Sequence, residues 1–227
     1  MHERPDTIQF EGGAGIIDCA LDWPRPQTAA SVDDINGWAL LLHPHPLHGG
    51  ARGNKVVTTL SRACTQAGML AVRPDFRGVG LSQGTHDDGR GETDDMVGLI
   101  EQFAQRFPDI AARRFVLAGF SFGSFVAAGV AQRRAASQLP APDGLVLVGT
   151  AVRRFDVAPV PPDTLVIHGE EDDTITLAQV LDWARPQGLP VVVIPGASHF
   201  FHGKLIQLKQ VVENYLLAQF ARNPGRS

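Results

Sequence analysis

A serine between two glycines is the first feature that could do chemistry. The stretch GFSFG (119–123) follows the apolar run 114–120 and opens a helical pattern over 122–136. In this context the glycines allow a tight strand-to-helix turn that exposes the serine hydroxyl. The amide of Phe122, at the helix start, would be free to stabilise an oxyanion. We therefore predict Ser121 as a nucleophile and Phe122 as an oxyanion donor. The alternative is a turn that only connects two elements.

A serine nucleophile needs a base, and two histidines follow the last apolar run of the chain. The sequence over 190–205 is PVVVIPGASHFFHGKL. His199 comes a few residues after the predicted strand, whereas His202 begins the next helical pattern. We predict His199 as the base and assign His202 a capping or packing role.

The base needs an orienting acid, and four acidic residues in a row follow the run TLVIHG (164–169). Several carboxylates buried together would raise one another's pKa and take up protons, so one of them is expected to face the imidazole. We predict Asp172, which lies three residues beyond Gly169. The other three acids are assigned to a solvated face or to helix capping.

Alternating strand and helix patterns must position these residues. Near-continuous apolar runs predict buried strands, and helical periodicity lies between them. This alternation predicts one α/β domain over 1–227, with a mostly parallel sheet and helices on both faces. Two early runs within 7–23 predict an antiparallel edge hairpin, and 221–227 is expected to be a frayed tail. The predicted strands are 37–43, 70–74, 114–120, 144–149, 164–169 and 190–196, and the predicted helices are 54–68, 93–107 with Thr93 as N-cap, 122–136, 176–183 and 204–220.

Four motifs stand in a fixed order along this pattern: HPHPLHGG (43–50), DFRGVGLSQG (75–84), GFSFGS (119–124) and PGASHFFHGKL (195–205). Together they resemble the α/β-hydrolase superfamily, and within it a group of small hydrolases without a lid. The resemblance implies an α/β-hydrolase fold with Ser121 as nucleophile, Asp172 as acid and His199 as base, in the chain order of that fold. It does not supply a substrate, because the fold hosts many chemistries.

In such a fold the loop LLHPHPLHGG (41–50) would supply a second oxyanion-hole amide. Proline has no amide hydrogen, so the candidates are His45, Leu47 and His48, and we expect Leu47. The histidines would bond to loop backbone, with His43 inside and His48 nearer the rim.

Closely spaced histidines also suggest a metal site. The spacing His-x-His-x-Asp-His is typical of dinuclear metal hydrolases, but Leu47 stands where the carboxylate ligand is needed. A zinc site also requires further ligands and the groups that orient them. We therefore expect neither a metal nor another cofactor.

The site is expected to be open, because the segment between Gly149 and Thr164 is too short for a helical lid. Arg153 and Arg154, within it, could meet an acidic substrate group, but we interpret them as surface residues. In the segment 75–84, Arg77 or Ser82 could touch substrate, but we predict a structural role in which a charge-assisted bond between Asp75 and Arg77 pins the loop. The segment 86–95 reads as a solvated loop and helix cap. The predicted apolar walls are Leu47, Phe120, Phe122, Val152, Phe155 and Phe200.

Composition limits the partners of the chain. A net charge of −4 over 227 residues argues against nucleic acid, whose binding requires clustered Lys and Arg. The N-terminus has no apolar core of a signal peptide, and no apolar run approaches the ~18 residues of a membrane helix. We therefore expect a cytoplasmic protein with no membrane partner. Cys19 and Cys64 read as buried free thiols.

The residues and the resemblance together predict a serine hydrolase that cleaves small to medium carboxylic esters through an acyl-enzyme. A thioesterase or amidase with the same three residues is the alternative within this chemistry. A non-catalytic binding or scaffold member of the fold is the alternative from another class. Sequence does not indicate the oligomeric state.

Overall fold

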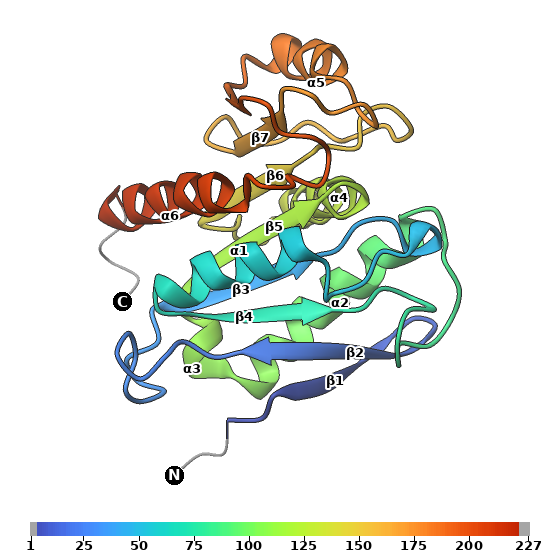
Figure 1. Cartoon of the computed structure of the whole chain (residues 1–227). Coiled ribbons are helices and arrows are strands. Elements are labelled where there is room, and N and C mark those ends of the chain that lie inside the picture. The colour runs from blue at the N-terminus through green and yellow to red at the C-terminus, as the bar shows by residue number, and fades with distance from the viewer. Residues whose placement is uncertain (1–3, 223–227) are drawn as a thin grey trace.

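One eight-stranded sheet organises the computed structural model, which describes residues 4–222 (Figure 1). The strand order is β1-β2-β4-β3-β5-β6-β7-β8. β1 pairs antiparallel with β2, and β2 pairs antiparallel with β4, whereas all later pairs are parallel. This confirms the predicted α/β fold with an antiparallel edge. The strands are β1 (Thr7–Gly12), β2 (Gly15–Asp22), β3 (Gly37–Leu42), β4 (Met69–Pro74), β5 (Arg114–Phe120), β6 (Gly144–Val148), β7 (Leu165–Gly169) and β8 (Val191–Ile194).

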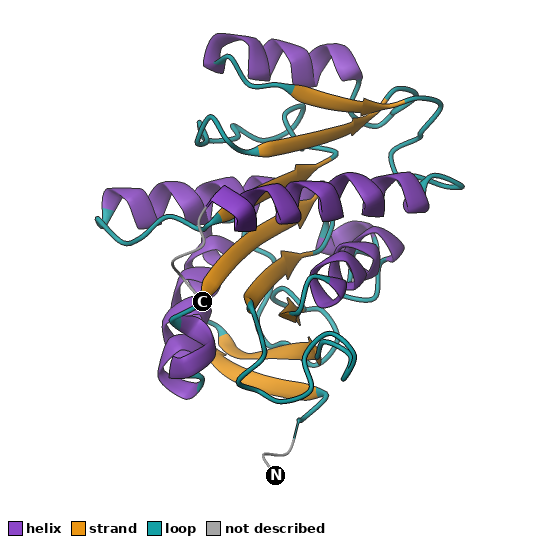
Figure 2. Ribbon diagram, turned by 90° about the vertical axis from the view of Figure 1, so that its left-hand side faces the viewer, coloured by secondary structure: helices purple, strands orange, loops and turns teal. Residues whose placement is uncertain are grey.

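Helices cover both faces of the sheet (Figure 2). α1 packs against α6 on one face, and α2 packs against α4 on the other. Each predicted helix is present, and the structure adds the four-residue α3 and two short 3₁₀ turns. The helices are α1 (Lys55–Gln66), α2 (Arg90–Arg106), α3 (Pro108–Ala111), α4 (Phe122–Ala136), α5 (Leu177–Ala184) and α6 (Leu205–Arg222), and the 3₁₀ turns are η1 (Pro46–His48) and η2 (Arg185–Gln187).

α2 begins at Arg90, so the prediction of Thr93 as its N-cap is wrong. The cap is Gly89, with a φ of 90°, and the buried carboxylate of Glu92 accepts the Gly89 amide at 2.9 Å. The Thr93 hydroxyl instead donates to the Gly89 carbonyl at 2.6 Å, as it does within a helix. A buried acid in the first turn therefore starts the helix earlier than the hydroxyl pattern suggested.

The order in which strands are added to the sheet changes sides at β3. β3 leads through α1 to β4 on one side, and the chain then returns over β3 to place β5 on its other side. Because parallel crossovers are right-handed, the two moves put α1 and α2 on opposite faces. The loops that follow β3 and β5 consequently diverge, which leaves a crevice at the carboxyl ends of these two strands.

The core consists of one apolar layer on each face of the sheet. The six residues of β3 are buried and alternate between the two layers, with Leu40 on the α2 and α4 side and Leu41 on the α1 and α6 side. Trp38 stacks between Phe103 and Phe115, with ring centroids 4.0 and 4.3 Å away. A strand buried on both faces holds the end of β3 rigidly.

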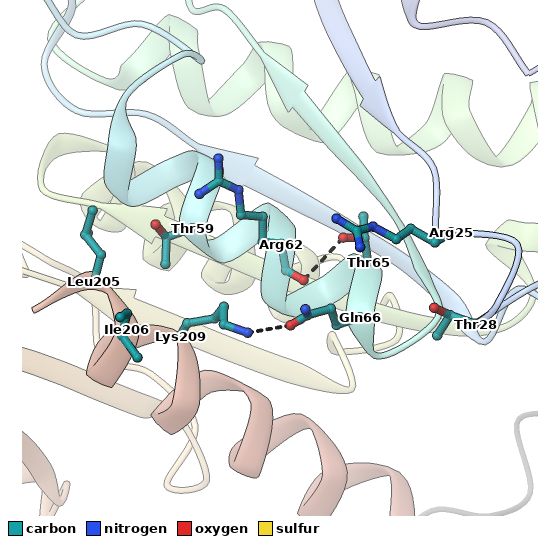
Figure 3. A pocket seen from close by; sticks show the side chains of 9 residues that line it. All are labelled: Arg25, Thr28, Thr59, Arg62, Thr65, Gln66, Leu205, Ile206 and Lys209. Carbon is teal, nitrogen blue, oxygen red and sulfur yellow. Dashed lines mark hydrogen bonds between the residues drawn. The ribbon is translucent and has the colours of Figure 1, made fainter.

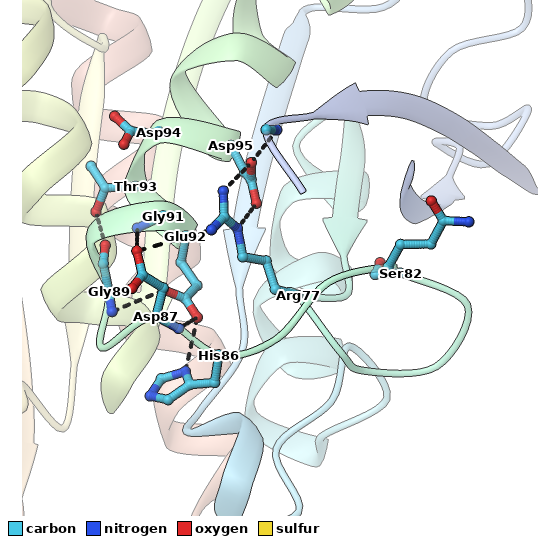
Figure 4. A network of polar contacts seen from close by, with 12 residues as sticks. Arg77, Ser82, His86, Asp87, Gly89, Gly91, Glu92, Thr93, Asp94 and Asp95 are labelled. Carbon is cyan, nitrogen blue, oxygen red and sulfur yellow. Dashed lines mark hydrogen bonds and ion pairs between the residues drawn. The ribbon is translucent and has the colours of Figure 1, made fainter. Parts of the chain in front are cut away.

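Ion pairs tie the edge hairpin to the loop after β4. Arg52 contacts Asp18 at 2.7 Å and Asp75 at 3.2 Å, and its amide donates to the Asp75 carboxylate. Arg77 instead extends to α2, where its Nη2 donates to Asp95 at 2.9 Å (Figure 4). The predicted bond between Asp75 and Arg77 is therefore wrong, because each residue has a partner on another element. The structural role predicted for this loop is confirmed.

No lid covers the sheet, since the segment between β6 and β7 contains no helix. Cys19 and Cys64 are buried and unpaired, as predicted. Within 4–222, no helix is both long and apolar enough to cross a bilayer. Of the predicted frayed tail, 221–222 still belong to α6, and 223–227 lie outside the described residues.

Candidate active site

Ser121 occupies a strained turn at the end of β5. Its φ of 54° and ψ of −120° are unusual for a residue with a side chain, and such conformations cost about 1–3 kcal/mol. Close packing of backbone imposes the turn, because a Cβ at Gly123 would collide with the carbonyl oxygens of Leu42 and His43. A Cβ at Gly119 would collide with the carbonyl of Gly123. The two glycines of GFSFG are therefore required by close contacts.

The structure brings Ser121, His199 and Asp172 into one hydrogen-bonded chain. His199 Nε2 lies 3.0 Å from Ser121 Oγ, and His199 Nδ1 lies 2.6 Å from Asp172 Oδ2. An ionised carboxylate only accepts hydrogen bonds, so Nδ1 carries the proton and Nε2 accepts from the serine hydroxyl. This is the geometry in which an imidazole can remove the hydroxyl proton.

Asp172 is buried and held by its own loop. Its Oδ1 accepts the amides of Thr174 at 3.0 Å and Ile175 at 2.8 Å. Burial raises the pKa of this carboxyl, but the hydrogen bonds from His199 and the Ile175 amide outweigh burial and hold the pKa below its usual value. The neighbouring acids Glu170, Glu171 and Asp173 are exposed, as expected for a solvated face.

His168 is a further member of this cluster that sequence reasoning missed. It is fully buried, and its Nε2 lies 2.8 Å from the Ile175 carbonyl and 3.5 Å from Asp172 Oδ2. Because a carbonyl only accepts, Nε2 carries the proton and donates to Ile175. Burial lowers the pKa of His168, so the ring is a neutral support for the loop that carries the acid. The sequence feature that could have indicated this role is the position of His168 near the end of a buried strand.

His43 is a structural residue of the loop after β3. Its Nδ1 lies 2.6 Å from the Pro44 carbonyl, and its Nε2 accepts the Phe76 amide at 2.9 Å. Both ring nitrogens are thereby used, and burial lowers the pKa of His43 to about 4. His48 is exposed, so the predicted inside and rim positions of these two histidines are confirmed.

The amides of this loop differ in their availability. The Leu47 amide donates to His45 Nδ1 at 3.3 Å, and the His48 amide donates to the His45 carbonyl at 3.1 Å. Within the described residues, the His45 amide and the Phe122 amide have no protein acceptor. The Leu47 side chain is 72% exposed and lies outside the cleft that contains Ser121. The structure thus does not support Leu47 as an oxyanion donor or as a wall.

A cleft of about 90 Å³ opens beside Ser121. Phe155 contributes to its wall, as predicted, and packs on Phe125 with centroids 4.7 Å apart. Phe120 is instead fully buried behind His199, with ring centroids 5.1 Å apart, so its prediction as a substrate wall is wrong. Phe200 is 45% exposed beside His199 but does not line the cleft. The lining residues are His45, His48, Ser121, Phe122, Ala151, Arg153, Arg154, Phe155, Thr174 and Ile175.

A buried polar pair supports the cleft from below. His86 Nδ1 lies 2.8 Å from Glu92 (Figure 4). The His86 ring packs against His45 and Phe122 at centroid distances of 4.6 and 5.2 Å. Glu92 is fully buried and also accepts the Asp87 amide. The prediction of a solvated loop over 86–95 is therefore wrong at these two residues, and Thr93 and Asp95 are buried as well. The segment does contain the cap of α2, which is Gly89.

A larger groove of about 240 Å³ lies between α1 and α6 (Figure 3). Its lining does not include Ser121, His199 or Asp172. Its cations are Arg25, Arg62 and Lys209, of which Lys209 bonds to Gln66 and to Glu213 at 2.9 Å. Nothing in this groove resembles a nucleophile with a base. Among residues 4–222, no three His, Cys, Asp or Glu side chains converge in a way that could hold a metal ion.

The family model described as "Serine aminopeptidase, S33" matches residues 45–165, more than half of the chain. The chain belongs to this family. It is similar to a structure of an α/β serine hydrolase without a lid from Xanthomonas campestris, with 34% identity, 93% of each chain covered and a TM-score of 0.82. It is also similar to an α/β serine hydrolase homologue from Coxiella burnetii, with 31% identity, 94% and 98% coverage and a TM-score of 0.81. An uncharacterized protein of Rickettsia prowazekii is 30% identical over 192 residues, 79% of this chain and 78% of that protein.

His43 should make stability depend on pH. Its pKa is about 4 in the folded protein and ~6.5 when unfolded, so the unfolded chain binds more protons between these values. The contribution of neutral His43 to the free energy of unfolding is complete above pH ~6.5. It decreases by about 3 kcal/mol as the pH falls toward 4. Urea unfolding of the His43→Gln variant should therefore show a shallower acid decline than the wild type.

The exposed His202 offers a matched control for this measurement. His202→Gln should follow the wild-type curve at every pH. Parallel acid declines for His43→Gln and the wild type would contradict the role assigned to burial of His43.

Proposed function

We propose that this α/β serine hydrolase cleaves small to medium carboxylic esters through an acyl-enzyme intermediate. The observation that carries the proposal is the hydrogen-bonded chain from Asp172 through His199 to the Ser121 hydroxyl. The strained turn at Ser121 adds to it, because strain of this kind persists only where the surroundings enforce it.

In the proposed reaction, His199 Nε2 takes the hydroxyl proton as Ser121 Oγ attacks the ester carbonyl. The resulting imidazolium is stabilised by ionised Asp172 and then gives its proton to the departing alcohol. Water, deprotonated by the same imidazole, attacks the acyl-enzyme, and the acid leaves as Ser121 recovers its proton. The proton first taken from Ser121 thus leaves with the alcohol, and a proton from water replaces it on the serine.

The tetrahedral oxyanion requires donors with no other acceptor. We assign the amides of Phe122 and His45 to this role, in place of the predicted Leu47. Support comes from the bond that occupies the Leu47 amide and from the position of His45, which lines the cleft together with Ser121 and Phe122.

The charge of the cleft favours an ester over an N-terminal peptide. An aminopeptidase must bind a free ammonium group, which calls for a carboxylate in the substrate cleft. The side chains that line this cleft include two arginines and no Asp or Glu. A thioester would meet the same nucleophile and donors, and a thioester panel separates the two chemistries.

Removal of the nucleophile should abolish turnover without unfolding the protein. We expect Ser121→Ala to lose ester hydrolysis and labelling by a fluorophosphonate probe, while circular dichroism stays unchanged. Asp172→Asn should lower kcat/KM by a factor on the order of 10³ to 10⁴, because the imidazole loses its orientation and its counter-charge.

Asp173→Asn is the matched control, since Asp173 is the exposed neighbour of the buried acid. It should keep kcat/KM within about twofold of the wild type. Labelling of folded Ser121→Ala, or a larger loss in Asp173→Asn than in Asp172→Asn, would overturn these assignments.

Proline substitution tests the second oxyanion donor, because it deletes an amide hydrogen. His45 has a φ of −55°, which proline adopts. We expect His45→Pro to lower kcat/KM by about 10² to 10³, and Leu47→Pro to lower it far less. His45→Ala, which removes the ring but keeps the amide, controls for the lost side chain. A greater loss in Leu47→Pro would restore Leu47 to the role.

The small open cleft should limit the length of acyl chain that increases kcat/KM. Each methylene removed from water contributes about 0.8 kcal/mol, or about fourfold in kcat/KM, but this gain ends where the chain leaves the cleft. We expect kcat/KM on 4-nitrophenyl esters to rise from acetyl and to level or fall before dodecanoyl, with no jump above the solubility limit. A steady rise to the longest chain would require a covered tunnel.

A further inference from the structure

Two arginines give the cleft beside Ser121 a single sign of charge. Arg153 and Arg154 line it and are exposed, and no Asp or Glu is among the lining residues. Within 4–222 neither arginine forms an ion pair with a carboxylate. The sequence-based interpretation of both as ordinary surface residues leaves these uncompensated charges unexplained.

The arginines stand on a turn that is fixed to the reacting groups. The Ala151 amide donates to Ser124 Oγ at 3.2 Å, and Ser124 Oγ in turn donates to the Ser121 carbonyl. Phe155 closes the turn by stacking on Phe125 of α4. The guanidinium groups are therefore attached to a rigid support beside the nucleophile.

Arg153 also contacts the loop that carries the acid. Its Nη1 donates to the Thr174 carbonyl at 3.2 Å, and the Thr174 amide is one of the two that bind Asp172. Arg154 lines the same cleft as His45. Burial chiefly lowers the pKa of His45 to about 4, and the charges of His86, His48 and Arg154 act in the same direction.

We propose that Arg153 and Arg154 form a subsite for an anionic group of the substrate, so that the preferred ester carries a carboxylate on the part held in the cleft. This inference rests on the proposed function and names its substrate class. Guanidinium groups suit the site because they bind carboxylates through paired hydrogen bonds. The apolar residues Phe122, Phe155 and Ile175 line the same cleft.

The test compares esters that differ only by charge. Monomethyl glutarate and its neutral isostere methyl 4-carbamoylbutanoate place the group on the acyl side, and 3-acetoxypropanoate and 3-acetoxypropanamide place it on the alcohol side. In at least one pair, the wild type should prefer the anion by about tenfold in kcat/KM at low salt. Sodium chloride should reduce this preference, because it screens exposed charges.

The double variant Arg153→Gln/Arg154→Gln should bring the ratio of anionic to neutral kcat/KM close to one. Arg185→Gln is the control, because Arg185 is exposed outside the cleft and pairs with Asp182. A ratio near one for both pairs in the wild type, or an unchanged ratio in the double variant, would overturn the subsite.

Failure of the proposed function has a different signature. In that case neither neutral nor anionic esters are hydrolysed, and the fluorophosphonate probe does not label Ser121. Calorimetric titration with glutarate then tests, independently of catalysis, whether the subsite binds a carboxylate. Binding that the double variant weakens by about tenfold or more supports the subsite, and absence of binding to the wild type overturns it.

Discussion

The close approach of the ends of β3 and β5 to the start of α4 determines the rest of the site. α4 starts so near to the end of β3 that only glycine fits at position 123, beside the carbonyls of Leu42 and His43. This contact leaves the residue before α4 in a strained turn and aims its hydroxyl away from the sheet. The buried strand β3 and its two apolar layers supply the rigidity that holds the strain.

Sequence reasoning succeeded where local pattern and chain order carry the information. The apolar runs placed the strands to within a few residues, and the motif at 119–123 predicted a turn that the structure contains. His199 and Asp172 were selected because each follows a buried strand, and parallel strands deliver such residues to one edge of the sheet. Neither inference required knowledge of distant contacts.

The errors arose where contacts between residues far apart in the sequence determine the position or partner of a group. Arg77 was paired with the nearby Asp75, but it reaches Asp95 on another element, which adjacent sequence does not reveal. Phe120 was expected to face substrate, yet alternation along β5 directs it into the layer behind His199. Leu47 was chosen by excluding prolines, without the acceptor that the His45 ring provides for its amide.

The uncovered segment between β6 and β7 has a kinetic consequence. Enzymes that close over a bound intermediate keep water away from it and can pass an acyl group to another acceptor. Here no helix folds over the cleft, so an acyl group on Ser121 would face bulk solvent as soon as it formed. Under the proposed mechanism, we expect such a site to partition its acyl-enzyme toward hydrolysis rather than transfer to a second alcohol, with no opening step before product release.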